Sequence, residues 1–131
     1  MGKVIQAAIA LMLAATPVMA QSDEGDPAKG EKVFKKCKAC HVVDKEKNKV
    51  GPHLVNLFGR TAASVKGYKY SSAMKAKGAE GLVWKAETLD PYLKKPRGYI
   101  AKTKMAFPGL KKESDRKNIL AYLKKATKTA E

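Results

Sequence analysis

The chain has 131 residues, of which 27 are basic and 12 acidic, so its formal net charge is +15. This length suits one small domain with a modest buried core, and no internal repeat, low-complexity tract or second domain appears in the sequence. A strong positive charge favours acidic partners and permits binding to a nucleic acid.

The first twenty residues predict a secretory signal peptide. Lys3 supplies a positive charge, residues 4–15 are apolar, and Val18 and Ala20 fit a cleavage site. We therefore expect cleavage after Ala20 and a mature domain of residues 21–131. The apolar run is short for a bilayer span, and an uncleaved anchor is the alternative. Removing the one lysine leaves 26 basic residues against 12 acidic ones, a formal charge of +14.

Two terminal helices are predicted. Asp26 is a good N-cap and Pro27 suits the first helical position. Gly30 in this first helix indicates close approach of another element, because a helical glycine is otherwise unfavourable. The last helix follows Ser114, a possible cap, and its apolar residues recur at helical spacing: Ile119, Leu120, Tyr122, Leu123 and Ala126. We expect the two helices to cross at Gly30.

Between these helices lies Cys37-Lys38-Ala39-Cys40-His41, the attachment pattern of a c-type haem. Residues three apart on a helical turn project from one face. Cys37 and Cys40 can therefore both reach the vinyl groups at one edge of a porphyrin, while His41 presents its imidazole to the iron. Thioether bonds to both sulfurs would leave no free thiol.

Three other interpretations of the cysteine pair fit less well. A thioredoxin-like pair needs a surrounding β-α pattern, which this sequence lacks. A structural zinc ion needs four ligands. The chain offers only Cys37, Cys40, His41 and His53, and two of these are adjacent and poorly placed to bind the same ion. A disulfide across two intervening residues closes too short a loop to stabilise the chain much.

The middle of the chain is rich in loops. Gly51-Pro52 predicts a turn, and residues 54–58 form a short apolar piece that ends at Gly59. Short helices are expected over residues 73–79 and from about 85 to 95, the second one stopped by Pro96. Residues 97–110 are expected to be extended. No βαβ pattern appears, so the predicted class is all-α.

Ordered matches along the chain resemble class I cytochromes c, close to the soluble bacterial c-two type and to mitochondrial cytochrome c. They cover nearly all of residues 26–127 and include Gly30-Glu31-Lys32-Val33-Phe34, Lys49-Val50-Gly51-Pro52, Leu57-Phe58-Gly59-Arg60, Gly67-Tyr68-Lys69-Tyr70, Val83-Trp84-Lys85, Thr103-Lys104-Met105 and Ile119-Leu120-Ala121-Tyr122-Leu123. The resemblance implies one covalent haem c, with crossing terminal helices, short helices and loops wrapped around it.

The sixth iron ligand has three candidates in the mature chain: Met74, Met105 and His53. Met105 lies in a loop with enough slack to cross the distal face. His53 directly follows a turn that, by resemblance, lies on the proximal side. Met74 falls on a predicted helix, where packing is its expected role. We therefore assign Met105 as the axial ligand; a thioether opposite histidine favours ferrous iron.

Other residues are assigned around the haem. The ligating histidine should donate its second ring N–H to an acceptor, and the resemblance implies the Pro52 carbonyl. The resemblance also places Arg60, Tyr68, Tyr70 and Trp84 near the propionates, and Tyr92 and Thr103 near the methionine sulfur. Considered without the resemblance, each of these six could serve packing alone.

The sequence departs from the family pattern in three places. Pro91 falls inside a predicted helix, which we expect to restart or kink there. Ala101-Lys102 stands where a Pro-Gly pair is usual, which predicts a less rigid distal loop. Met74 occupies a position that is often polar. None of the three is a predicted haem ligand.

An iron with both axial positions filled exchanges electrons but does not easily bind a substrate. We therefore predict a periplasmic, monomeric one-electron carrier, not an enzyme, that has no membrane span once mature. Its expected partners are a cytochrome bc complex or dehydrogenase and a terminal oxidase or photosynthetic reaction centre. Acidic faces of these partners would meet lysines near the motifs: Lys35, Lys36, Lys38, Lys45, Lys47, Lys49, Lys94, Lys95, Lys102, Lys104, Lys111 and Lys112.

Two other function classes fit the sequence less well. A haem enzyme or gas sensor would need a vacant distal position. Met105, in the Thr103-Lys104-Met105 run, argues against a vacant position because it is the assigned axial ligand. A basic nucleic-acid binder is permitted by the charge, but export and haem attachment disfavour it.

Overall fold

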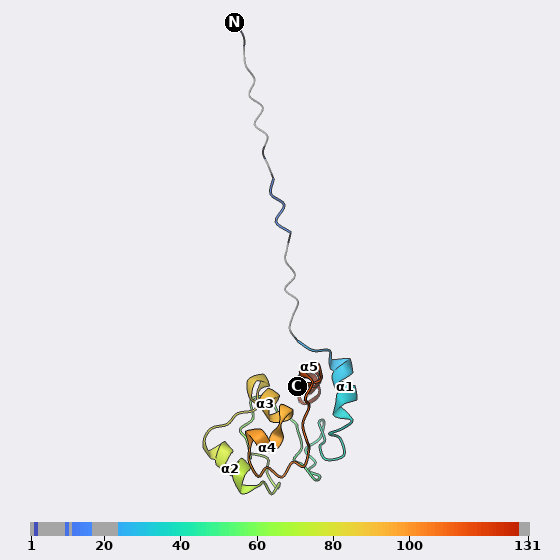
Figure 1. The fold of residues 1–131 in the computed structure, drawn as a ribbon. Coiled ribbons are helices and arrows are strands. Elements are labelled where there is room, and N and C mark those ends of the chain that lie inside the picture. The colour runs from blue at the N-terminus through green and yellow to red at the C-terminus, as the bar shows by residue number, and fades with distance from the viewer. Residues whose placement is uncertain (1, 3–9, 11, 17–23, 129–131) are drawn as a thin grey trace.

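The computed structural model describes residues 2, 10, 12–16 and 24–128 (Figure 1). The predicted cleavage site between Ala20 and Gln21 lies outside these residues. The elements are α1 (Pro27–Phe34), α2 (Ser72–Ala79), α3 (Ala86–Lys94), α4 (Pro96–Tyr99) and α5 (Glu113–Ala126). Over the described ranges no strand forms beyond the isolated bridge between Thr61 and Val83, so the all-α prediction is confirmed. No helix in these ranges is long and apolar enough to cross a membrane.

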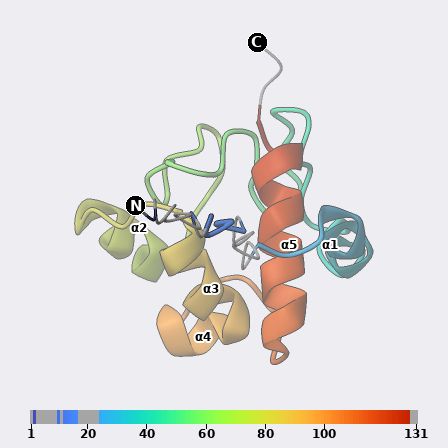
Figure 2. The ribbon, with the colours of Figure 1, turned by 90° about the horizontal axis from the view of Figure 1, so that it is seen from above.

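Helix α1 begins as predicted and packs crosswise against α5 (Figure 2). The Asp26 carboxylate accepts hydrogen bonds from the backbone N–H groups of Ala28 and Lys29, at 2.8 and 3.4 Å. A Cβ atom at Gly30 would overlap the backbone carbonyl of Asn118 in α5. Only glycine therefore allows the two backbones to approach this closely, and the predicted crossing at Gly30 is confirmed.

Helix α5 begins earlier than predicted, because its N-cap is Lys112 and Ser114 lies inside the first turn. Glu113 and Asp115 are also in that turn, where negative charge is stabilised by the helix dipole. Arg116 is buried and its Nε donates to the Asp90 carboxylate, 2.8 Å away. Its Nη1 donates to the carbonyls of Leu110 and Lys111, each at 2.9 Å. This one side chain thus joins α5 to α3 and to the segment before α5.

Helix α3 runs unbroken from Ala86 to Lys94 with Pro91 inside it, so the expected restart at Pro91 does not occur. Thr88 supports its N-terminal end, since its Oγ1 accepts from the Lys85 backbone N–H at 3.0 Å. The prediction that residues 97–110 are wholly extended is wrong at its start, because Pro96–Tyr99 forms the one-turn helix α4. Pro96 stands at its first position, where the fixed φ of proline is already helical.

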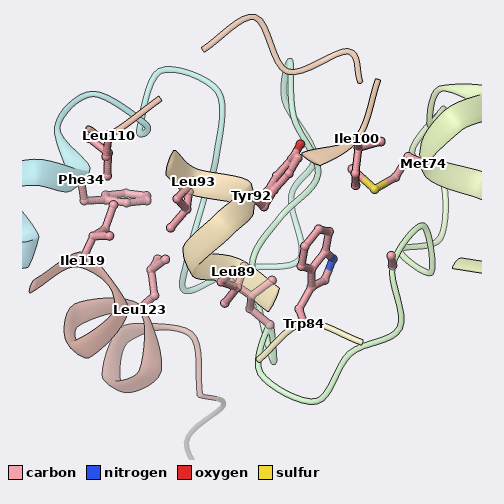
Figure 3. Packing of buried hydrophobic residues seen from close by; sticks show 12 residues of the cluster. Phe34, Met74, Trp84, Leu89, Tyr92, Leu93, Ile100, Leu110, Ile119 and Leu123 are labelled. Carbon is pink, nitrogen blue, oxygen red and sulfur yellow. The ribbon is translucent and has the colours of Figure 1, made fainter. Parts of the chain in front are cut away.

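The core lies between α1 and α5 on one side and α3 with the loops on the other (Figures 2 and 3). Leu89, Tyr92 and Leu93 project into it from α3. Helix α2, which begins one residue before its predicted start, contributes Met74 near Ile100. These elements surround the cavity that carries the candidate site.

Candidate functional site

A cavity of about 280 Å³ lies among α1, α3, α5 and the loops. Its lining contains all eleven residues that the sequence assigned to the haem: Cys37, Cys40, His41, Pro52, Arg60, Tyr68, Tyr70, Trp84, Tyr92, Thr103 and Met105. Met74 also lines it. Side chains separated by nearly seventy residues in the sequence are thus brought to one space.

The cysteine motif forms a turn that continues from the end of α1. The Cys37 N–H donates to the Phe34 carbonyl at 2.8 Å, and the N–H groups of Cys40 and His41 donate to the Cys37 carbonyl at 3.1 and 3.0 Å. Burial raises the pKa of the Cys37 thiol to about 11, an effect that Lys36 opposes and Cys40 reinforces. Cys37 therefore lacks the lowered pKa of an activated thiol nucleophile.

The His41 ring is held by a backbone carbonyl. Its Nδ1 lies 2.7 Å from the Pro52 oxygen, which can only accept, so Nδ1 carries the proton. The neutral ring then has an unprotonated Nε2, the form that binds a metal. Burial lowers the pKa of His41, with the Pro52 hydrogen bond raising it and Arg60 lowering it further. The predicted His41–Pro52 contact is present.

Gly51 is a site residue that the sequence analysis does not predict, because there Gly51 serves only in a turn. A Cβ atom at this position would collide with the His41 ring. Glycine here lets the backbone lie close to the imidazole, while the next residue offers the carbonyl that orients the ring. The available signal was a Gly-Pro pair in which the proline already had a predicted role beside the histidine.

Arg60 provides a test of whether the cavity suits a haem. Its Nη1 donates to the carbonyls of His53 and Val55 at 3.0 and 3.1 Å. Its Nε is buried without a hydrogen-bond partner among the described residues. A buried donor left unsatisfied costs about 1–3 kcal/mol, and a propionate carboxylate at the cavity would supply the missing acceptor. The donor set therefore fits a haem.

The two predicted propionate-side tyrosines differ in their hydrogen bonds. The Tyr68 hydroxyl donates to the Val50 carbonyl at 2.8 Å, which uses its one proton. The Tyr70 hydroxyl accepts from the Val65 backbone N–H at 3.1 Å and keeps its proton available. Burial raises the pKa of both phenols. Tyr70 is thus the better donor toward a carboxylate.

Trp84 and Tyr92 both line the cavity, and their ring centroids are 5.0 Å apart (Figure 3). The Tyr92 and Thr103 hydroxyls are 3.0 Å apart, and the Met105 backbone N–H donates to the Thr103 Oγ1 at 3.5 Å. The hydroxyl pair thus lies beside the backbone of Met105, and its position near the methionine sulfur stays a prediction.

The three candidates for the sixth ligand occupy different positions. Met105 is half-buried in the cavity lining, on a segment without helix. Met74 is buried on α2 and its side chain reaches the same cavity. His53 is outside the lining, and its Nδ1 accepts from the Val55 backbone N–H at 3.2 Å. Two thioethers therefore face the cavity, which sequence reasoning did not anticipate for Met74.

Helices of the described residues enclose a cavity lined by a Cys-x-x-Cys-His turn, and this arrangement defines a small c-type haem domain. The chain belongs to the cytochrome c family, whose model matches residues 27–127. It is 53% identical to cytochrome c2 of Afifella marina over 74% of this chain and 79% of that protein. It is 48% identical to cytochrome c of Nigella damascena over 82% of this chain and 96% of that protein. It is 50% identical to cytochrome c-550 of Ancylobacter novellus over 75% of this chain and 92% of that protein.

Membership of this family settles the cofactor and the class of activity. The protein is a class I c-type cytochrome that carries haem c through two thioether bonds, for which the chain has Cys37 and Cys40. It is an electron-transfer protein and not an enzyme.

Proposed function

We propose that this cytochrome is a periplasmic one-electron carrier whose iron is bound axially by His41 and Met105. The haem supplies a ferric–ferrous couple. His41 offers Nε2 because Nδ1 is committed to Pro52, and that commitment is the observation that carries the proposal. Met105 offers a thioether from the same cavity. With both positions occupied, the protein would exchange electrons without admitting a substrate.

The test separates the two methionines. Met105→Ala should abolish the far-red sulfur-to-iron band of the ferric protein and lower the midpoint potential, whereas Met74→Ala should leave the band in place. Carbon monoxide should bind slowly to the ferrous wild type and rapidly to Met105→Ala. Loss of the band in Met74→Ala, with Met105→Ala unchanged, would move the assignment to Met74.

We further propose that its partners are acidic faces of membrane redox complexes, namely a cytochrome bc complex or dehydrogenase as donor and a terminal oxidase or photosynthetic reaction centre as acceptor. The formal charge of +14 on residues 21–131 supports this through electrostatic steering. The bimolecular rate with such a complex should fall steeply as salt rises, because the Debye length shortens to about 8 Å at physiological ionic strength. A rate independent of salt would contradict the proposal.

Periplasmic location rests on the predicted signal peptide and on c-type haem attachment outside the cytoplasm. The exported protein should begin at Gln21 and retain its haem after denaturation, as read by intact mass spectrometry. A cytoplasmic protein with residues 1–20 intact would contradict this location.

A further inference from the structure

Lys49 connects the haem-attachment motif to the turn behind it. Its ammonium Nζ donates to the Lys38 carbonyl, 3.1 Å away, and Lys38 lies between the two cysteines. No other hydrogen bond from the described residues reaches that carbonyl. The Lys49 backbone N–H also donates to the Gly51 carbonyl at 2.9 Å. One residue is thus bonded both to the motif and to the turn that supports His41.

The Lys49 contact is the first in an ordered series. Residues 38–42 and 49–54 lie side by side, and successive contacts join them in the same order along both segments. These contacts are Lys49 Nζ to Lys38 O at 3.1 Å, Gly51 N to Cys40 O at 2.9 Å, His41 Nδ1 to Pro52 O at 2.7 Å and Leu54 N to Val42 O at 2.8 Å. The Lys49 contact is the one among them made by a charged side chain.

We propose that Lys49 is a positioning residue that fixes the first half of the motif against residues 49–54 and thereby sets the orientation of the His41 ring. The Lys49 side chain is exposed and its contact is the longest of the four, but its donor is charged, and a charged donor strengthens a hydrogen bond. Without the ammonium, the Lys38 carbonyl would lose its protein partner, and the contacts between the motif and residues 49–54 would begin only at Cys40. The sequence interpretation had grouped Lys49 with the docking lysines; here its amine is used within the chain.

This inference rests on the proposed ligation of iron by His41. The experiment uses the haem-loaded protein and compares Lys49→Met with Lys47→Met. Lys47 is exposed in the same loop, carries the same charge, and its side chain makes no hydrogen bond to a described residue. Lys49→Arg keeps a charged donor and serves as the rescue. Proton NMR of the ferric form reads the haem methyl shifts, which depend on the plane of the axial imidazole.

Lys49→Met should shift the haem methyl resonances and lower the guanidinium unfolding midpoint relative to Lys47→Met, and Lys49→Arg should restore both toward wild type. Failure of Lys49→Met to load haem, when the other two variants load it, would support the same role. Equal spectra and equal midpoints for Lys49→Met and Lys47→Met would overturn it and leave Lys49 as a surface charge. A wild-type spectrum without a histidine-ligated low-spin iron would instead refute the proposed function.

Discussion

The segments that carry the two proposed iron ligands are built differently. On the histidine side, residues 38–42 are joined to residues 49–54 by four consecutive contacts of 2.7 to 3.1 Å. On the methionine side, the Met105 N–H makes a longer bond of 3.5 Å to Thr103. No hydrogen bond between described residues holds the backbone of residues 106–109. Lys102, three residues before Met105, adopts a positive φ of 63°.

This difference indicates where the domain opens first. Regions with few hydrogen bonds and local backbone strain open at lower free energy than the rest of a fold. The methionine segment is nevertheless anchored at both ends, because Ile100 and Leu110 are buried and Leu110 N donates to Leu93 O at 2.8 Å. We therefore expect the methionine side to release its ligand while the histidine side stays intact.

The largest effect is expected on the histidine side, from Gly51→Ala. The added methyl group would collide with the His41 ring, and overpacking a close contact costs about 3 kcal/mol at the upper end of its usual range. The free energy of unfolding should fall by that amount in guanidinium titrations.

Gly81→Ala is the matched control for Gly51→Ala. Its new Cβ meets nothing within 4 Å, and only the positive φ of 91° opposes it, at a cost of about 1 kcal/mol. Equal losses at the two glycines would show that the His41 side is not tightly packed and would break the contrast between the two sides.

An intermediate effect is expected from Arg116→Met, which tests the C-terminal anchor of the methionine side. The substitution leaves the carbonyls of Leu110 and Lys111 without their Arg116 donor, at a cost of about 2 kcal/mol for the lost charged hydrogen bonds. The far-red band should disappear at lower guanidinium concentration than in the wild type.

The control for Arg116→Met is Lys117→Met, which removes an exposed ion pair of 3.2 Å with Glu113. Such surface pairs contribute about 0.5 kcal/mol or less. If both variants lost the band at the same guanidinium concentration, Arg116 would not anchor this segment.

The sequence predicted features that depend on local chemistry. Asp26-Pro27 predicted the start of α1, and the spacing of Cys37, Cys40 and His41 predicted covalent haem attachment. Gly51 was missed because its requirement comes from a ring ten residues away, and contact between distant segments leaves no periodic pattern. Helix α4 and the early start of α5 were missed because each depends on tertiary packing as well as on capping signals.

Met74 shows that the sequence is limited in the same way when it is used to predict the functional site. Helical spacing correctly placed it on α2, but the sequence could not show that this buried side chain also faces the cavity. Likewise, the lysines of the motifs looked equivalent in the sequence. Only the structure distinguishes Lys49 and Lys104, whose ammonium groups donate to the carbonyls of Lys38 and Lys69 at 3.1 and 2.6 Å.

The smallest effect is expected from Lys102→Gly, which sharpens the comparison on the methionine side. A non-glycine residue in the left-handed region costs about 1 kcal/mol or slightly more, and glycine removes that strain. Glycine also adds freedom to the unfolded chain, which costs about 0.5–1 kcal/mol. The net gain in unfolding free energy should therefore be small, about 0.5 kcal/mol by difference.

Ala63→Gly provides the matched comparison for Lys102→Gly, since Ala63 has a φ of 60° but lies away from the methionine segment in the chain. Ala63→Gly should raise global stability less than Lys102→Gly, because it also removes a methyl group that packs against the core. Only Lys102→Gly should weaken binding of added imidazole to the ferric protein, because imidazole must displace Met105 and that requires the strained segment to open. A difference of about 0.5 kcal/mol corresponds to roughly twofold in affinity. Equal imidazole affinities in the two variants would place the first opening outside the turn at Lys102, and the strain would then belong to the global fold and not to the ligand loop.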